Sequence, residues 1–151
     1  MSQSLSQIFL HIVFSTKERR PFLKDKTIRE RMHIYLKGIC DNQGCVSLKV
    51  GAVEDHVHIA CRLSKTITVS GLIKELKHGS SIWVKGEFPE LSAFHWQNGY
   101  GAFSVSPSHI PGLKEYIENQ EEHHRRESYQ DELRRLLNKY GVEFDERYIW
   151  D

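Results

Sequence analysis

The sequence predicts an α+β fold of the ferredoxin-like (RRM-like) type, in which an antiparallel sheet carries two helices on one face. Apolar patterns follow one another in the order strand, helix, strand, strand, helix, strand. The 151 residues are 39% hydrophobic and 27% charged, which is typical of one soluble globular domain. No repeat, low-complexity tract or linker divides the chain. The two helices leave one sheet face free, and we expect a later helix on or near it.

The first half of the chain supplies a strand, a helix and a hairpin. Residues 6–15, "SQIFLHIVFS", are rich in Ile, Phe and Val, as buried strands are. Apolar side chains recur at helical spacing over residues 25–42, and Gly44 follows as a stop. Residues 46–53 and 56–63 have strand character, and the two residues between them suit a tight hairpin turn.

The second half begins with a helix capped by Thr66 or Thr68. This helix either ends at Gly79 or continues through "KHGSSIWVKGEFP". The aromatic, glycine-punctuated residues 94–106 indicate a bent strand or a hairpin. A last helix over about residues 130–140 has leucines on one side and precedes a short tail.

Composition and charge narrow the class of protein. No window reaches the roughly 18 apolar residues of a membrane span and the start of the chain lacks signal-peptide features, so we expect a cytoplasmic protein without a membrane partner. The net charge of +1 neither demands nor excludes nucleic acid. The odd set Cys40, Cys45 and Cys61 has no C-x-x-C spacing, which suggests neither a disulfide framework nor a cysteine zinc site.

The stretch "VEDHVHIAC" places two histidines on one strand. Side chains alternate along a strand, so His56 and His58 share one face while Val57 and Ile59 face the other way. Two imidazoles about 7 Å apart are able to converge on one metal ion. A pair of surface histidines would give the same pattern in a chain with nine of them. A second signal is therefore needed.

A third helix, which begins near Pro111 and includes "GLKEYIENQEEHHRR" at residues 112–126, carries that second signal. Tyr116 and Gln120 are four residues apart on the inward side of this helix, so a phenol and an amide oxygen can approach the histidine pair together. His124 falls on the same side and ranks below Gln120 as a ligand. A core tyrosine with a satisfied hydroxyl and an edge glutamine would explain the same residues singly.

An ordered set of motifs gives the chain a resemblance to a known family. The segments are "HIVFSTKERRPFL", "DHVHIACRL", "LIKELKHGSSIWVK", "WQNGYGAFSVS" and "YIENQEEHHR". Their order and spacing resemble the single-tyrosine HUH transposases of small insertion sequences and their relatives associated with repeated extragenic palindromes. The resemblance covers about residues 5–126, the catalytic core of one transposase domain spanning residues 1–151. Residues 127–151 form a C-terminal helix and a tail whose ending, "DERYIW", also resembles this group.

The resemblance implies DNA transposition and recombination by cleavage and rejoining of single-stranded DNA with hairpin ends. Tyr116 would be the nucleophile that forms a 5′-phosphotyrosine link, and its general base is not identified. His56, His58 and Gln120 would hold a divalent metal, Mg²⁺ or Mn²⁺, with zinc not excluded by ligand type. The resemblance also implies a homodimer, in which the tyrosine helix either completes its own site or reaches the partner's histidines.

Other side chains are candidates for contact with DNA. Basic residues that are able to bind phosphates are Lys17, Arg19, Arg20, Lys74 and Lys77. Aromatic residues that are able to stack on bases are Phe94, Trp96, Tyr100 and Phe103. Solvated basic faces and core aromatics explain the same residues equally simply.

Three other functions remain open at this point. A noncatalytic ferredoxin-like nucleic-acid-binding module would leave the histidines incidental. In a metal-dependent phosphodiesterase, water would attack in place of Tyr116. A domesticated relative would keep these residues without activity.

Overall fold

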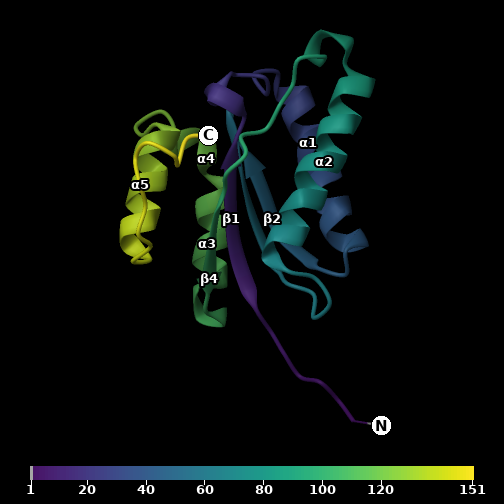
Figure 1. Ribbon diagram of the computed structural model, residues 1–151, viewed down its shortest axis with the longest axis vertical. Coiled ribbons are helices and arrows are strands. Elements are labelled where there is room, and N and C mark those ends of the chain that lie inside the picture. The colour runs from purple at the N-terminus through teal and green to yellow at the C-terminus, as the bar shows by residue number, and fades with distance from the viewer. Residues whose placement is uncertain (1) are drawn as a thin grey trace.

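The computed structural model describes residues 2–151, and its centre is a four-stranded antiparallel sheet in the order β2-β3-β1-β4 (Figure 1). The strands are β1 (Phe9–Ser15), β2 (Val46–Ala52), β3 (His56–Arg62) and β4 (Gly101–Val105). With α1 (Lys26–Asn42) after β1 and α2 (Val69–Glu87) after β3, the chain has the predicted ferredoxin-like order.

Helices α1 and α2 pack together on one side of the sheet, as predicted (Figure 1). Asp25 caps α1 by accepting hydrogen bonds from the backbone N–H groups of Thr27 and Ile28. Thr68, rather than Thr66, caps α2 in the same way. Helix α2 continues through Gly79, where a Cβ atom would lie 3.0 Å from Cδ1 of Ile39 on α1, so the missing side chain lets the two helices approach closely.

Strand alternation divides the buried side chains between the two faces. In β1, Leu10, Ile12 and Phe14 join the core beneath α1 and α2. The side chains of β3 that join the same core are Val57, Ile59 and Cys61. His56 and His58 therefore face the opposite side of the sheet, as predicted from the period of two.

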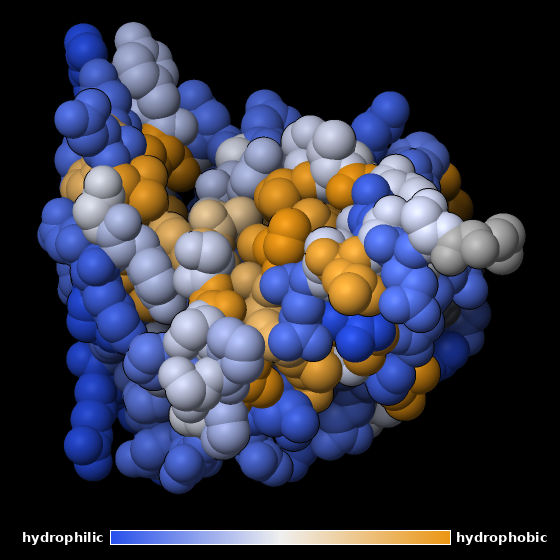
Figure 2. All heavy atoms as spheres, turned by 90° about the horizontal axis from the view of Figure 1, so that it is seen from below, coloured by the Kyte–Doolittle hydropathy of each residue, from blue (hydrophilic) through white to orange (hydrophobic). Residues whose placement is uncertain are grey.

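That opposite side is covered by the C-terminal third of the chain, α3 (Ile110–Glu118), α4 (Gln120–His123) and α5 (Tyr129–Lys139) (Figure 1). A second apolar cluster joins α5 to the sheet: Val13, Phe103, Tyr129, Leu133, Leu136 and Leu137. Figure 2 shows the molecule from below, with the α5 side at the left as in Figure 1. Apolar side chains line a hollow between this left edge and the middle of the molecule. The three cysteines are buried and form no disulfide.

Helix α3 lies unusually close to β2 because of Gly51. A Cβ atom at this position would lie 2.6 Å from the backbone oxygen of Ile117 and 2.7 Å from its Cγ2 atom. Gly51 is the register partner of His58 on β3. The missing side chain thus brings the tyrosine helix against the sheet beside the histidine strand.

One expectation about the second half is wrong: helix α3 ends at Glu118 and Asn119 separates it from α4, so residues 112–126 do not form a single helix. Residues 94–106 pair along β1 in two steps, as a bent strand does: Trp96 bridges to Thr16, and Gly101–Val105 pairs with β1 farther along. No helix in the described part of the chain is long and apolar enough to cross a membrane.

Candidate active site

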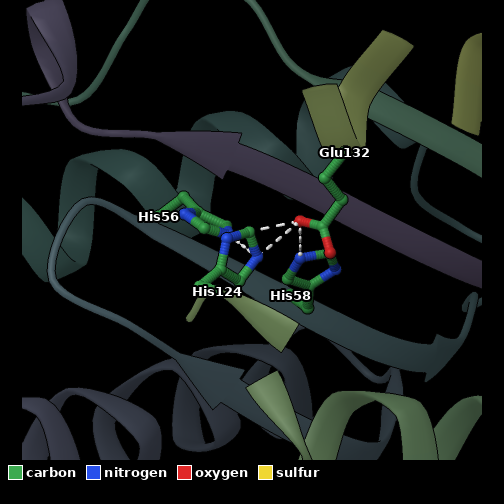
Figure 3. Close-up of side chains that lie close together, drawn as sticks. All are labelled: His56, His58, His124 and Glu132. Atoms are coloured by element: carbon green, nitrogen blue, oxygen red, sulfur yellow. Dashed lines mark hydrogen bonds and ion pairs between the residues drawn. The ribbon is translucent and has the colours of Figure 1, made fainter. Parts of the chain in front are cut away.

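Four side chains from three elements converge on the free face of the sheet (Figure 3). His56 and His58 come from β3, His124 follows α4, and Glu132 projects from α5. One ligand atom from each lies within 4.8 Å of all the others. Three of the four side chains are fully buried, and His124 is 11% exposed.

The carboxylate of Glu132 is the centre of this cluster. Its Oε1 atom lies 3.2 Å from Nε2 of His56, 2.8 Å from Nε2 of His58 and 3.0 Å from Nε2 of His124. The Nε2 atoms of His56 and His124 are 3.0 Å apart. Ligands about 2.0–2.1 Å from a tetrahedral metal are separated by roughly 3.4 Å, so a small adjustment would fit these four atoms to one ion.

Both histidines of the strand have their second ring nitrogen fixed. Nδ1 of His56 lies 2.7 Å from Oδ1 of Asp55, and Nδ1 of His58 lies 2.7 Å from Nε2 of His11 on β1. An Nδ1–H that donates to these acceptors leaves the Nε2 lone pair directed at the cluster. Metal-ligating histidines in proteins are oriented by such outer contacts. The donor set therefore fits a divalent metal.

The charges of the buried groups also suit a metal. Burial lowers the pKa of His58, and it lowers the pKa of His11 to about 3. Burial acts in the same direction on His56, but its hydrogen bonds to Asp55 and Glu132 outweigh burial and raise its pKa. Burial alone would raise the pKa of Glu132, yet the surrounding histidines outweigh burial and hold it well below its usual range. An ionised carboxylate is thus present among imidazoles.

Tyr116 contacts the same carboxylate from α3. Its hydroxyl donates a hydrogen bond to Oε2 of Glu132 and accepts one from Nη2 of Arg135, 2.7 Å away. The ring centroid lies 5.8 Å from that of His58. Burial and the adjacent Glu132 raise the pKa of Tyr116, and the guanidinium of Arg135 opposes them. The hydroxyl is therefore protonated in this arrangement.

Gln120 lies near Tyr116 but not in the four-residue cluster. It is buried, and its Nε2 donates to the backbone oxygen of Tyr116 at 3.2 Å. Its Oε1 atom is buried and has no hydrogen-bond partner within the described residues. An unpaired buried amide oxygen is an available ligand atom, although no described contact joins it to His56 or His58.

Glu132 and Arg135 were not predicted from the sequence. Both follow the motif-bearing segments and lie on a helix whose sequence pattern is dominated by leucines. One signal was present: Glu132 is three residues after Tyr129 and four before Leu136, on the buried stripe of α5. A carboxylate at such a position needs buried partners.

The basic residues proposed as DNA contacts lie in different settings. Lys17 and Arg20 line an open cavity of about 320 Å³ together with Lys85 and His95. Lys74 is exposed on α2, and Arg19 is half-buried in the turn after β1. Contact between these basic residues and DNA phosphates therefore stays a prediction.

Lys77 and the aromatic residues have roles in the fold. Lys77 donates to the backbone oxygens of Gln97, Asn98 and Gly99, and burial lowers its pKa to about 8. It therefore fastens the loop before β4. Among the aromatic candidates for base stacking, three are buried and Tyr100 is 43% exposed: the buried ones are Phe94, Trp96 and Phe103.

Comparisons with known proteins identify a family and a fold for this chain. A model of the family described as "Transposase IS200 like" matches residues 4–120. Among solved structures, a candidate transposase from Deinococcus radiodurans aligns with a TM-score of 0.64 and 23% identity, over 80% of this chain and 98% of that chain. A REP-associated tyrosine transposase bound to a REP hairpin aligns with a TM-score of 0.59 and 13% identity, over 82% of this chain and 74% of that chain. These identities show likeness of fold alone. Comparison with curated proteins finds no match.

Proposed function

This chain belongs to the IS200-like transposase family, and from that premise we propose that it cleaves and rejoins single-stranded DNA through a 5′-phosphotyrosine intermediate. Tyr116 is the nucleophile. His56 and His58 hold a divalent metal together with His124, with the unpaired Oε1 of Gln120 as a further ligand atom. The DNA carries hairpin ends, as the REP hairpin bound to the structural neighbour suggests.

One observation carries the proposal: a single carboxylate, that of Glu132, contacts both the histidines and the tyrosine. Oε1 faces the three Nε2 atoms, and Oε2 accepts the hydrogen bond of the Tyr116 hydroxyl. A single carboxylate group thus fills the space between the three histidine Nε2 atoms and the Tyr116 hydroxyl. A phosphodiester in that space would direct one oxygen at the histidines and its phosphorus at the phenol. In our proposal, the scissile phosphate takes the place of the Glu132 carboxylate.

A bound metal would act as a Lewis acid that offsets the charge developing on the phosphate oxygens. The cluster favours Mn²⁺ over Mg²⁺ because imidazole nitrogens outnumber oxygens. Asp55 and His11 keep the two strand histidines in the tautomer that presents Nε2. His124 lies beyond the segment that matches the family model, so its part as a ligand is specific to this proposal.

The covalent step exchanges one phosphodiester bond for another. The phenol of Tyr116 gives up its proton and its oxygen attacks phosphorus, while the bond from phosphorus to the 3′ oxygen breaks. The 3′ oxygen takes up a proton and leaves as a 3′-hydroxyl, so one proton is released and one is consumed. Rejoining reverses the step, with the 3′-hydroxyl as the attacking group. Arg135 donates to the phenolic oxygen in both directions, which stabilises negative charge on it.

A cleavage assay on single-stranded DNA from the flanks of the gene, with and without Mn²⁺ or Mg²⁺, tests the proposal. We expect a denaturation-resistant protein–DNA adduct from the wild type that disappears in Tyr116→Phe. Tyr148→Phe is the matched control, because Tyr148 is 64% exposed in the C-terminal tail. Cleavage without any adduct would instead indicate hydrolysis by water. Binding without metal-dependent cleavage would indicate the noncatalytic module or an inactive relative.

A further inference from the structure

A cavity of about 370 Å³ opens beside the phenol of Tyr116. It lies between β4, α3 and α5, and its walls include Arg135, Lys139 and Tyr140. Its volume is within the range of about 300–1,000 Å³ that is typical of small-molecule sites. Tyr116 therefore lines this cavity and also contacts the histidine cluster through Glu132.

The cavity wall carries positive charge and no carboxylate. Arg135 and Lys139 are four residues apart on α5, so they lie on the same side of that helix. Lys139 makes no ion pair within residues 2–151. Glu127 pairs with Arg135 but does not line the cavity, so an anion inside the cavity would meet two cations and no acidic wall residue.

Arg135 is already positioned for such an anion. Its guanidinium is held by Glu127, with Nε 3.0 Å from Oε1 and Nη2 3.2 Å from Oε2. The same Nη2 lies 2.7 Å from the Tyr116 hydroxyl. An anion on this guanidinium would therefore be adjacent to the atom that attacks phosphorus.

The remaining walls suit a nucleobase and a sugar. The ring of Tyr140 is stacked on Phe103, with centroids 4.6 Å apart and planes 10° from parallel. Leu113 and Leu136 add apolar surface, and Ser104 and Ser106 also line the cavity. A cavity with an aromatic wall, apolar surface and two cations matches the three parts of a nucleotide.

We propose that this cavity is a subsite for one nucleotide next to the scissile phosphate, whose own phosphate contacts Arg135 and Lys139 and whose base lies against Tyr140. The subsite rests on the proposed function, since it places the strand across Tyr116. It assigns to α5 a direct role in holding the substrate strand. Helix α5 lies outside the segment that matches the family model.

Binding measurements in a Tyr116→Phe background test the subsite without any cleavage. The probe is a fluorescent single strand from the flank of the gene, titrated at several salt concentrations. We expect Arg135→Gln and Lys139→Gln each to weaken binding by about five-fold or more, and to reduce the slope of log Kd against log salt by about 0.7. Arg134→Gln is the matched control, because the neighbouring Arg134 is paired with Asp131 and Glu146 and does not line the cavity.

A photo-cross-link locates the nucleotide. Single 5-iodouracil substitutions are placed along the same strand, and we expect one position to cross-link to the peptide that contains Tyr140. Affinities of the Arg135 and Lys139 variants equal to that of Arg134→Gln, or cross-links only elsewhere, would overturn the proposal. Displacement of the strand by inorganic phosphate as effectively as by a deoxynucleotide would show a simple anion site, and would also overturn it.

Failure of the subsite and failure of the proposed function give different results. Loss of the subsite leaves the wild-type adduct on Tyr116 intact. Loss of the proposed function removes that adduct, while the binding difference between Arg135→Gln and Arg134→Gln persists. Circular dichroism of each variant checks that the fold is retained.

Discussion

Replacement of Gly51 by alanine should slow DNA cleavage far more than it destabilises the fold. The added Cβ would lie 2.6 Å from the backbone oxygen of Ile117 and 2.7 Å from Cγ2 of the same residue. Ordinary van der Waals contact begins at 3.4 Å, so α3 must move away from β2 by about 0.8 Å. The Ile117 contact includes backbone, so a side-chain rotation cannot relieve it.

The displacement acts directly on the nucleophile. Tyr116 precedes Ile117 on α3, and a misplacement of about 1 Å costs on the order of 100-fold in rate. Overpacking of this kind costs about 1–3 kcal/mol of stability, which the fold can tolerate. We therefore expect a folded Gly51→Ala protein whose single-turnover cleavage is reduced by roughly two orders of magnitude.

The control for Gly51 is Gly86→Ala. Gly86 lies on α2, where an added Cβ meets nothing within 4 Å, so alanine should raise stability by about 0.5–1 kcal/mol and leave cleavage unchanged. Single-turnover cleavage and urea unfolding measure the two quantities. A Gly51→Ala protein that cleaves at the wild-type rate would refute the argument that close packing of α3 positions Tyr116.

Three further predictions concern the cluster. His58→Ala should abolish metal-dependent cleavage and lower the affinity for Mn²⁺, measured by calorimetry or electron paramagnetic resonance. The control His78→Ala, at an exposed position, should change neither. Unchanged Mn²⁺ affinity in His58→Ala would remove His58 from the ligand set. The pKa of His11 is lowered to about 3 in the folded chain, so between about pH 6.5 and pH 3 the unfolded chain binds more protons at this residue than the folded chain does. The free energy of unfolding should therefore fall by up to about 1.4 kcal/mol per pH unit as the pH falls from about 6.5 toward 3. Urea unfolding at pH 7 and pH 5 should show a smaller loss in His11→Gln, and an equal loss would contradict the assignment. Mixed Tyr116→Phe and His58→Ala chains should not regain cleavage, because Tyr116 contacts Glu132 of its own chain; recovery in confirmed heterodimers would show that sites form between subunits.

The sequence predicted the parts of the fold and site that depend on local periodicity. Alternation along β3 placed His56 and His58 on the free face, and helical spacing placed Tyr116 on the inward side of α3. The same spacing placed Gln120 on the buried side beside Tyr116, but a helical wheel assumes a continuous helix and so did not predict the interruption at Asn119. A residue with a short polar side chain is a weak helix former, but tertiary contacts decide whether the helix ends there.

The rest of the site depends on contacts between segments far apart in the chain. Glu132 meets His58 across 74 positions, and no local pattern specifies which buried group a carboxylate on α5 will contact. Lys77 illustrates the same limit, because its sequence context suggests a solvated cation while the folded chain surrounds its ammonium with three carbonyl oxygens. Burial of a polar residue was predictable at Glu132, and the identity of its partners was not.

Mapping of the covalent adduct tests the central claim most directly. Wild-type protein is incubated with labelled single-stranded DNA and Mn²⁺, denatured, and digested with nuclease and protease, and the peptide that retains a nucleotide is identified by mass spectrometry. We predict one modified peptide, with the phosphate on the oxygen of Tyr116. A nucleotide on any other residue, or strand cleavage with no modified peptide, would contradict the account.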